Sequence, residues 1–121
     1  MGKHNKTGQQ GEQAAADFLE KKGYQILHKN WRYKRAEIDI VAKDRRTLIF
    51  VEVKTRTDYT FGRPENAVDG KKQRLMTQAA IAYMSESGHD GAIRFDILSL
   101  ILRGGEFFID HYEDAFFPGL A

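Results

Sequence analysis

The sequence predicts an α/β (α+β) domain in which helices flank a central, mixed, five-stranded sheet. Two segments show helical periodicity, and five others are predicted as strands, two of which alternate clearly between apolar and polar residues. Along the chain these segments follow the order helix, three strands, helix, two strands, or αβββαββ. A chain of 121 residues can bury a core as one domain without disulfides or metals.

The first predicted helix spans about residues 8–22. Its apolar residues recur at helical spacing, and Gly23 is typical of the position just after a helix. Residues 1–7 precede it as a flexible basic tail, which leaves residues 8–121 for the single domain. Glu12 falls on the edge of the apolar stripe, whereas most helix glutamates point at water.

Three strands are predicted next, at about residues 24–31, 36–42 and 47–55. The second and third alternate well around the polar turn "KDRR", which predicts a β-hairpin. If all four residues form the turn, Ala42 pairs with Thr47. Asp39 then lies diagonal to Glu52 on one face, and Glu37 faces Glu52 directly.

The second half of the chain predicts a loop, a helix and another hairpin. Gly, Pro and Asn mark residues 58–66 as the loop, and helical spacing continues from residue 68 or 69 to residue 86. Strands are predicted at residues 92–102 and 107–114, joined by the turn "RGGE".

Composition favours a globular protein of a reducing compartment. Hydrophobic residues make up 41% of the chain and charged residues 30%, and cysteine is absent. A disulfide framework and a thiolate site are therefore excluded. The N-terminus lacks the apolar segment of a signal peptide, and no apolar run approaches membrane-spanning length. These features predict a cytoplasmic protein without a membrane contact.

The net charge of +2 conceals an uneven distribution. Residues 1–74 hold 17 Lys and Arg against 10 Asp and Glu, a balance of +7. Residues 75–121 hold 2 against 7, a balance of −5. Either the charges simply solvate the surface, or the first part of the chain builds a basic surface suited to a polyanion.

Polar residues on one face of the predicted hairpin raise the question of chemistry. Glu52 and Lys54 point the same way from their strand, but an acid two positions before a lysine occurs three times in this chain and carries little weight alone. With an even turn, Glu37, Asp39 and Glu52 share a patch with Lys54. Close carboxylates need a positive charge among them. Lys54 and Arg56 could supply it as an ion-pair ladder, or a divalent cation such as Mg²⁺ could bind.

The segment "NWRYKRAEIDIVAKDRRTLIFVEVKTR" resembles the core of the restriction-endonuclease-like superfamily, the PD-(D/E)xK nucleases. From "GEQAAADFL" through "RFDIL" to "HYEDAF", nearly the whole chain is similar to the YraN-type family of small bacterial proteins. The arrangement is also similar to that of archaeal Holliday-junction resolvases.

The resemblance implies roles for particular residues. Asp39 matches the metal-binding aspartate, and Glu52 and Lys54 match the (D/E)xK pair. The backbone carbonyl of Val53 would be a further metal ligand, and Glu12 matches an acidic residue that resolvase-like members place near the metal. Together these imply catalytic roles for Asp39, Glu52, Lys54 and Glu12, with Mg²⁺, or Mn²⁺ in its place, as cofactor. Ile38 stands where the superfamily name has proline.

The function implied by the resemblance is that of a Mg²⁺-dependent, structure-selective DNA endonuclease that hydrolyses phosphodiester bonds as Holliday-junction resolvases do. One alternative is a nucleic-acid-binding module with a nuclease fold and little turnover, which acts with a DNA-processing partner. Another is an interaction protein whose carboxylates and lysines form only an ion-pair network.

Basic residues near the predicted site could contact branched or damaged DNA through its phosphates. They are Arg32, Arg35, Arg56, Lys71, Lys72 and Arg74. Each could equally be a solvated charge. Near the C-terminus, Phe116 and Phe117 either complete the core or form a homodimer contact.

Overall fold

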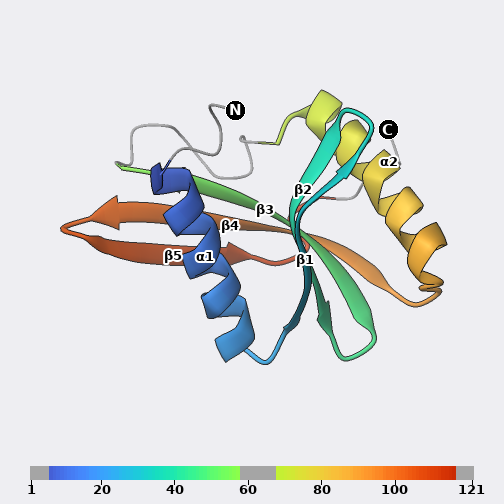
Figure 1. Cartoon of the computed structure of the whole chain (residues 1–121), viewed down its shortest axis with the longest axis horizontal. Coiled ribbons are helices and arrows are strands. Elements are labelled where there is room, and N and C mark those ends of the chain that lie inside the picture. Colours follow the sequence, from blue (N-terminus) through green and yellow to red (C-terminus); the bar gives the residue numbers. More distant parts are fainter. Residues whose placement is uncertain (1–5, 58–67, 117–121) are drawn as a thin grey trace.

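A computed structural model describes residues 6–57 and 68–116 of the chain (Figure 1). Its elements are α1 (Lys6–Lys21), β1 (Gln25–Tyr33), β2 (Ala36–Asp44), β3 (Thr47–Arg56), α2 (Gly70–Ser87), β4 (Ile93–Arg103) and β5 (Glu106–Tyr112). The predicted order αβββαββ is confirmed. Helix α1 includes Lys6 and Thr7, which the sequence had placed in a flexible tail, while residues 1–5 lie outside the described part.

The five strands form one mixed sheet, as predicted, and lie in the order β1-β2-β3-β4-β5. Strands β3 and β4 run parallel and are connected through α2, whereas the other neighbouring strands are antiparallel. Helix α2 contacts β1 and β2, and α1 contacts mainly β3 and β1. Both helices begin at the same end of the molecule, at the top of Figure 1.

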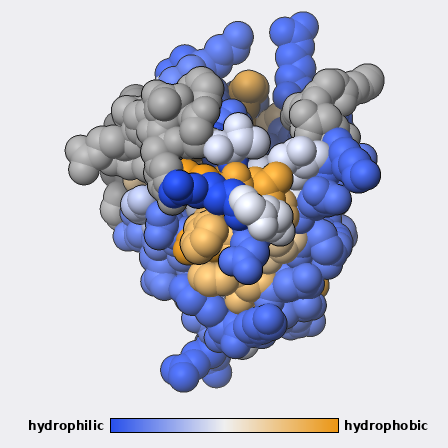
Figure 2. Space-filling model, turned by 90° about the vertical axis from the view of Figure 1, so that its left-hand side faces the viewer, coloured by the Kyte–Doolittle hydropathy of each residue, from blue (hydrophilic) through white to orange (hydrophobic). Residues whose placement is uncertain are grey.

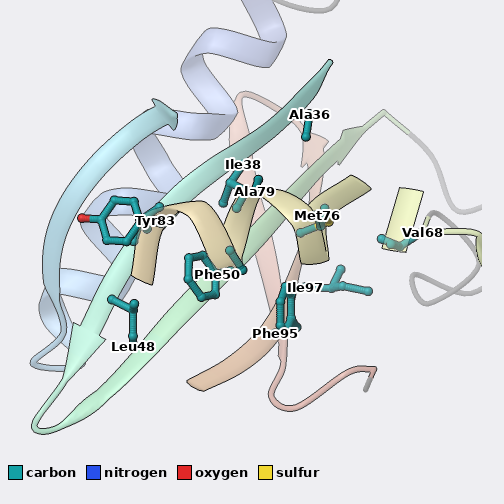
Figure 3. Packing of buried hydrophobic residues seen from close by; sticks show 12 residues of the cluster. Ala36, Ile38, Leu48, Phe50, Val68, Met76, Ala79, Tyr83, Phe95 and Ile97 are labelled. Carbon is teal, nitrogen blue, oxygen red and sulfur yellow. The ribbon is translucent and has the colours of Figure 1, made fainter. Parts of the chain in front are cut away.

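The core is divided into two layers by the sheet. Successive residues of β3 alternate between them: Leu48 and Phe50 belong to the layer with α2, and Ile49 and Val51 to the layer with α1. Figure 3 shows the first layer, in which Phe50 lies near Tyr83 of α2. A central strand buried on both faces holds its position firmly, so polar groups at its end are well fixed.

The position of Phe116 decides between the core and the homodimer contact that the sequence left open. Phe116 packs against the first layer, with its ring centroid 5.1 Å from that of Phe95. It therefore helps to complete the core, whereas Phe117 lies outside the described residues.

The turn between β2 and β3 differs from the prediction. It consists of Arg45 and Arg46 alone, and Asp44 pairs with Thr47. Arg45 adopts a left-handed φ of 57°, which allows the tighter turn and extends the ladder by two pairs. The predicted pairing of Ala42 with Thr47 is therefore wrong by two residues. Because both turn lengths are even, the faces to which side chains point are not inverted.

The surface at the left of Figure 1 is mainly hydrophilic, with a group of apolar residues near its centre (Figure 2). Among the described side chains, Ile81, Phe108 and Tyr112 are the large apolar ones that remain exposed. Neither α1 nor α2 is long and apolar enough to cross a membrane, and these are the helices of the described residues.

Candidate metal and nucleic-acid site

A cleft of about 990 Å³ is lined by the first turns of α1 and α2 and by parts of β2 and β3. The residues predicted to be catalytic all line it: Glu12, Asp39, Glu52 and Lys54. Val53 lines it as well. The fold therefore brings together one residue from α1, one from β2 and a short segment of β3.

Asp39 and Glu52 form a carboxyl pair at this cleft. The β2–β3 ladder reaches Ile40 and Val51, and one further step in the same register sets Asp39 beside Glu52 rather than diagonal to it. The two carboxyl groups are close enough that each shifts the pKa of the other. The amide of Val53 donates a hydrogen bond to Asp39 Oδ2, at 2.8 Å.

Burial controls the protonation of this pair. Burial, together with the neighbouring charge of Asp39, raises the pKa of Glu52 to about 8, against the opposing effect of Lys72. Burial also raises the pKa of Asp39, although the Val53 amide and the Lys72 charge partly offset it. The two groups titrate as one unit, as close carboxyls do in acid–base and metal sites.

Lys72, in the first turn of α2, forms an ion pair with Glu52. The sequence grouped Lys72 with DNA-contacting residues and did not reveal this contact. One signal was present: Lys72 interrupts the apolar stripe that continues through Met76 and Tyr83, as Glu12 does on α1. A charged residue in an apolar stripe needs a polar partner, which here is Glu52.

Other acidic and basic residues occupy the rim. Lys54 is exposed on β3, two residues beyond Glu52, and Glu12 is half-buried on α1. Glu37 does not face Glu52 as predicted, because the register is shifted; it pairs across β1 and β2 with Arg32, whose Nε lies 3.5 Å from Glu37 Oε2. Glu37 still lines the cleft and its charge raises the pKa of Asp39.

Most of the predicted DNA-contacting residues line the same cleft. They are Arg35, Arg56, Lys71 and Lys72. Arg32 and Arg74 are not among the lining residues. The N-terminus of α2 is capped by the Asp69 carboxylate, which also lines the cleft. The basic side chains therefore supply the attraction of this cleft for anions such as phosphate.

A glycine sets the close approach of α1 to the cleft. Gly11 packs against β3 so tightly that a Cβ placed on it would lie 3.1 Å from the Thr55 Cβ. The absence of a side chain at Gly11 thus lets the next residue, Glu12, reach the cleft wall.

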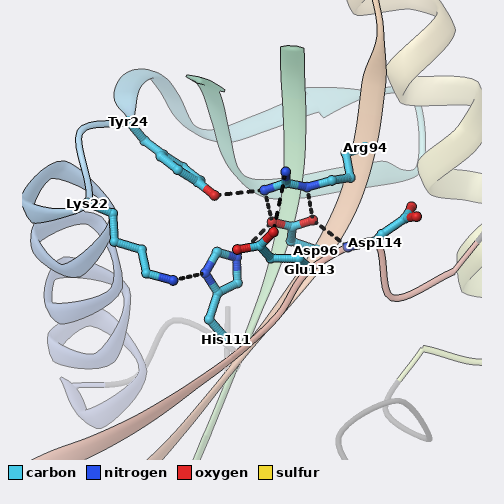
Figure 4. A network of polar contacts seen from close by, with 7 residues as sticks. All are labelled: Lys22, Tyr24, Arg94, Asp96, His111, Glu113 and Asp114. Atoms are coloured by element: carbon cyan, nitrogen blue, oxygen red, sulfur yellow. Dashed lines mark hydrogen bonds and ion pairs between the residues drawn. The ribbon is translucent and has the colours of Figure 1, made fainter. Parts of the chain in front are cut away.

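A second buried polar cluster lies away from the cleft (Figure 4). Asp96 is fully buried and accepts hydrogen bonds from Arg94, His111 and the Asp114 amide. Burial alone would raise the pKa of Asp96, but the bonds from His111 and Arg94 outweigh it and lower the pKa. Since Arg94 also donates to Tyr24, the cluster joins β4 and β5 to the connection between α1 and β1. Its contacts give it a structural role.

The donor set at the cleft fits a hard divalent cation. Asp39 and Glu52 provide oxygen ligands, and Mg²⁺ commonly takes one or two carboxylates and keeps several waters. Within residues 6–57 and 68–116, no three His, Asp or Glu side chains are grouped closely enough to hold a metal. Glu12 as a supporting acid and the Val53 carbonyl as a further ligand stay predictions.

The fold and the cleft define a small αβββαββ protein in which a largely buried carboxyl pair and several basic side chains line one cleft. The family model described as "Uncharacterised protein family UPF0102" matches residues 11–100, and the chain belongs to this family. This confirms the resemblance to the YraN-type proteins.

Several bacterial relatives match over nearly their whole length. A UPF0102 protein of Bacteroides thetaiotaomicron is 47% identical over 120 residues, which cover 99% of each chain. A UPF0102 protein of Phocaeicola vulgatus is 45% identical over 118 residues, or 98% of each chain. One of Flavobacterium psychrophilum is 44% identical over 117 residues, covering 97% of this chain and 98% of the relative. The names of these relatives state a family and no activity.

Proposed function

We propose that this protein is a Mg²⁺-dependent, structure-selective DNA endonuclease that hydrolyses phosphodiester bonds. The observation that carries the proposal is the Asp39–Glu52 pair, with Glu52 buried and Asp39 partly buried, in a cleft that basic residues also line. Removing adjacent carboxyls from water is unfavourable, and such an arrangement is typical of sites that bind a metal or transfer protons. The resemblance to PD-(D/E)xK nucleases supports the same assignment.

In this proposal Asp39 and Glu52 hold the metal. When bound, the metal supplies Lewis-acid polarisation of the phosphodiester and a lowered pKa for the attacking water. The Val53 amide fixes the orientation of Asp39 through its hydrogen bond to Oδ2. Both ligands are therefore held before any substrate arrives, which reduces the cost of ordering the site.

The chain's cations have a separate task. Lys54 is exposed on the same cleft as the carboxyl pair and can stabilise the negative charge that develops on the phosphate. Arg35, Lys71 and the first turns of both helices can contact flanking phosphates. Phosphate contacts carry no direct sequence information, so selectivity would come from the shape of the DNA. Branched DNA is the substrate class that this predicts.

A cleavage assay tests the proposal. Four-way junctions, nicked duplexes, linear duplexes and single strands are incubated with the protein in Mg²⁺ or Mn²⁺. Branched DNA should be cut only with metal, and Asp39→Asn, Glu52→Gln and Lys54→Met should each reduce the rate about 100-fold or more. Asp44→Asn is the matched control, because Asp44 is the last residue of β2, the strand that also holds Asp39. This variant should cut DNA like the parent. Equal cutting by parent and Glu52→Gln would contradict the proposal.

A second candidate is a nucleic-acid-binding module with little turnover. It is favoured by the ion pair of Lys72 with Glu52, because the carboxyl pair is then stabilised without a metal. This candidate predicts salt-dependent DNA binding that is unchanged by EDTA, with no cleavage of any substrate in Mg²⁺ or Mn²⁺. Metal-dependent cutting that is lost in Asp39→Asn would exclude it.

A further inference from the structure

Lys72 combines a fixed backbone with a mobile side chain. Its backbone amide donates to the Asp69 side chain that caps α2, with an N–O distance of 2.9 Å. The side chain then reaches across the cleft to Glu52. The Lys72 side chain is 41% exposed, whereas that of Glu52 is only 6% exposed. A change at this ion pair therefore requires rotation of one flexible lysine and no movement of the helix.

The protein itself supplies a counter-ion to the carboxyl pair. The Lys72 ammonium neutralises negative charge on Glu52 in the absence of a metal. A divalent cation carries twice the charge of that ammonium. One divalent cation bound at the pair can therefore take the place of Lys72 as its counter-ion.

Lys72 and a metal ion would compete for the same carboxylate. If a cation bound Glu52, the Lys72 ammonium at hydrogen-bonding distance from that carboxylate would be a repelled like charge. The half-exposed stem allows Lys72 to turn into the cleft instead, where Lys71 and Arg35 already face the open space. There its charge can meet a phosphate.

We propose that Lys72 is a displaceable counter-ion: it neutralises Glu52 while the metal is absent, and it moves to the phosphate of a nucleic acid when a divalent cation takes its place. The inference rests on the proposed metal site. Metal binding would then release the Lys72 ammonium from Glu52 and add its positive charge to the part of the cleft that faces DNA. Metal and DNA should bind with positive, reciprocal coupling.

Lysine labelling by reductive methylation tests this inference. The full-length protein is labelled with EDTA and, separately, with saturating Mn²⁺, and each lysine is quantified by peptide mass spectrometry. In the same samples, loss of the free-Mn²⁺ electron paramagnetic resonance signal measures metal binding. The labelling rate of Lys72 should rise about fivefold with metal, the factor expected when one half-exposed ion pair is broken. Lys43, on β2 and outside the carboxyl cleft, is the internal control and should change less than about twofold.

Glu52→Gln provides the second arm. Without its charged partner, Lys72 should be labelled at the raised rate already in EDTA, and Mn²⁺ should not increase it. If wild-type protein binds Mn²⁺ and Lys72 labelling stays unchanged, the displacement is refuted while the metal site stands. If wild-type protein binds no Mn²⁺, the metal site itself fails. Continued protection of Lys72 in Glu52→Gln would also refute the inference, since Glu52 would not be what holds it.

Discussion

Replacing Glu52 by glutamine should stabilise the metal-free protein, and increasingly so as the pH rises. Glutamine keeps the shape of the side chain and removes the buried charge. In the folded protein burial raises the pKa of Glu52 from its ordinary 4.5 to about 8, so the folded state holds the proton more tightly than the unfolded state. The free energy of unfolding of the parent therefore falls as the pH rises from 4.5 to about 8. Glu52→Gln has no carboxyl to titrate at this position, so its stability should not show this decrease.

The structure sets the size of the effect. Each pH unit between the two pKa values costs about 1.4 kcal/mol, so the parent should lose up to about 3 kcal/mol between pH 5 and pH 8. Much of this loss should appear as a growing stability difference between Glu52→Gln and the parent. At pH 5, where the parent is mostly protonated, the two proteins should differ little.

Urea unfolding in EDTA at pH 5, 6.5 and 8 measures this difference. Comparing the variant with the parent at each pH cancels the titration of the histidines, which both share. Glu20→Gln, at an exposed position of α1, is the matched control and should follow the parent at every pH. A difference between Glu52→Gln and the parent that does not change with pH would refute the raised pKa of the buried Glu52 carboxyl.

Three further outcomes follow from other contacts. Gly11→Ala should lower the free energy of unfolding by about 1 kcal/mol, since overpacking against Thr55 exceeds the gain in helix propensity; a more stable variant in urea would contradict the close packing. Asp96→Asn should cost about 3–5 kcal/mol in urea unfolding, because it leaves Arg94 without its buried partner; a loss below about 1 kcal/mol would contradict this. Lys71→Gln should reduce the slope of log K against log salt for DNA binding by about 1, and an unchanged slope would remove Lys71 from the interface.

The fold could be predicted well because its signals are local. Alternation in β2 and β3, helical spacing in the two helices and turn residues between them gave the element order, and each depends on neighbours in the chain. The length of the β2–β3 turn could not be read in the same way. Arg45 has no strong preference for the left-handed conformation that it adopts, so "KDRR" allowed both a four-residue and a two-residue turn.

The candidate site was only partly predictable. Asp39 and Glu52 were placed on one face because an even turn of any length keeps them there, although their direct contact depended on the actual register. The ion pair of Lys72 with Glu52 joins α2 to β3. Because a loop separates these two elements in the chain, the spacing of residues in the sequence does not predict which of their side chains meet. The tight packing at Gly11 was hidden for the same reason, as its partner Thr55 lies on a different element.

The proposed function requires that the Asp39–Glu52 pair binds a divalent metal. Anomalous diffraction from crystals soaked in Mn²⁺ measures this without an assay of activity, because it locates the Mn²⁺ ion itself. An anomalous peak coordinated by both carboxylates is expected, with the Lys72 ammonium withdrawn from Glu52. Crystals with full Mn²⁺ access that show no peak at this pair, and an intact ion pair between Lys72 and Glu52, would contradict it.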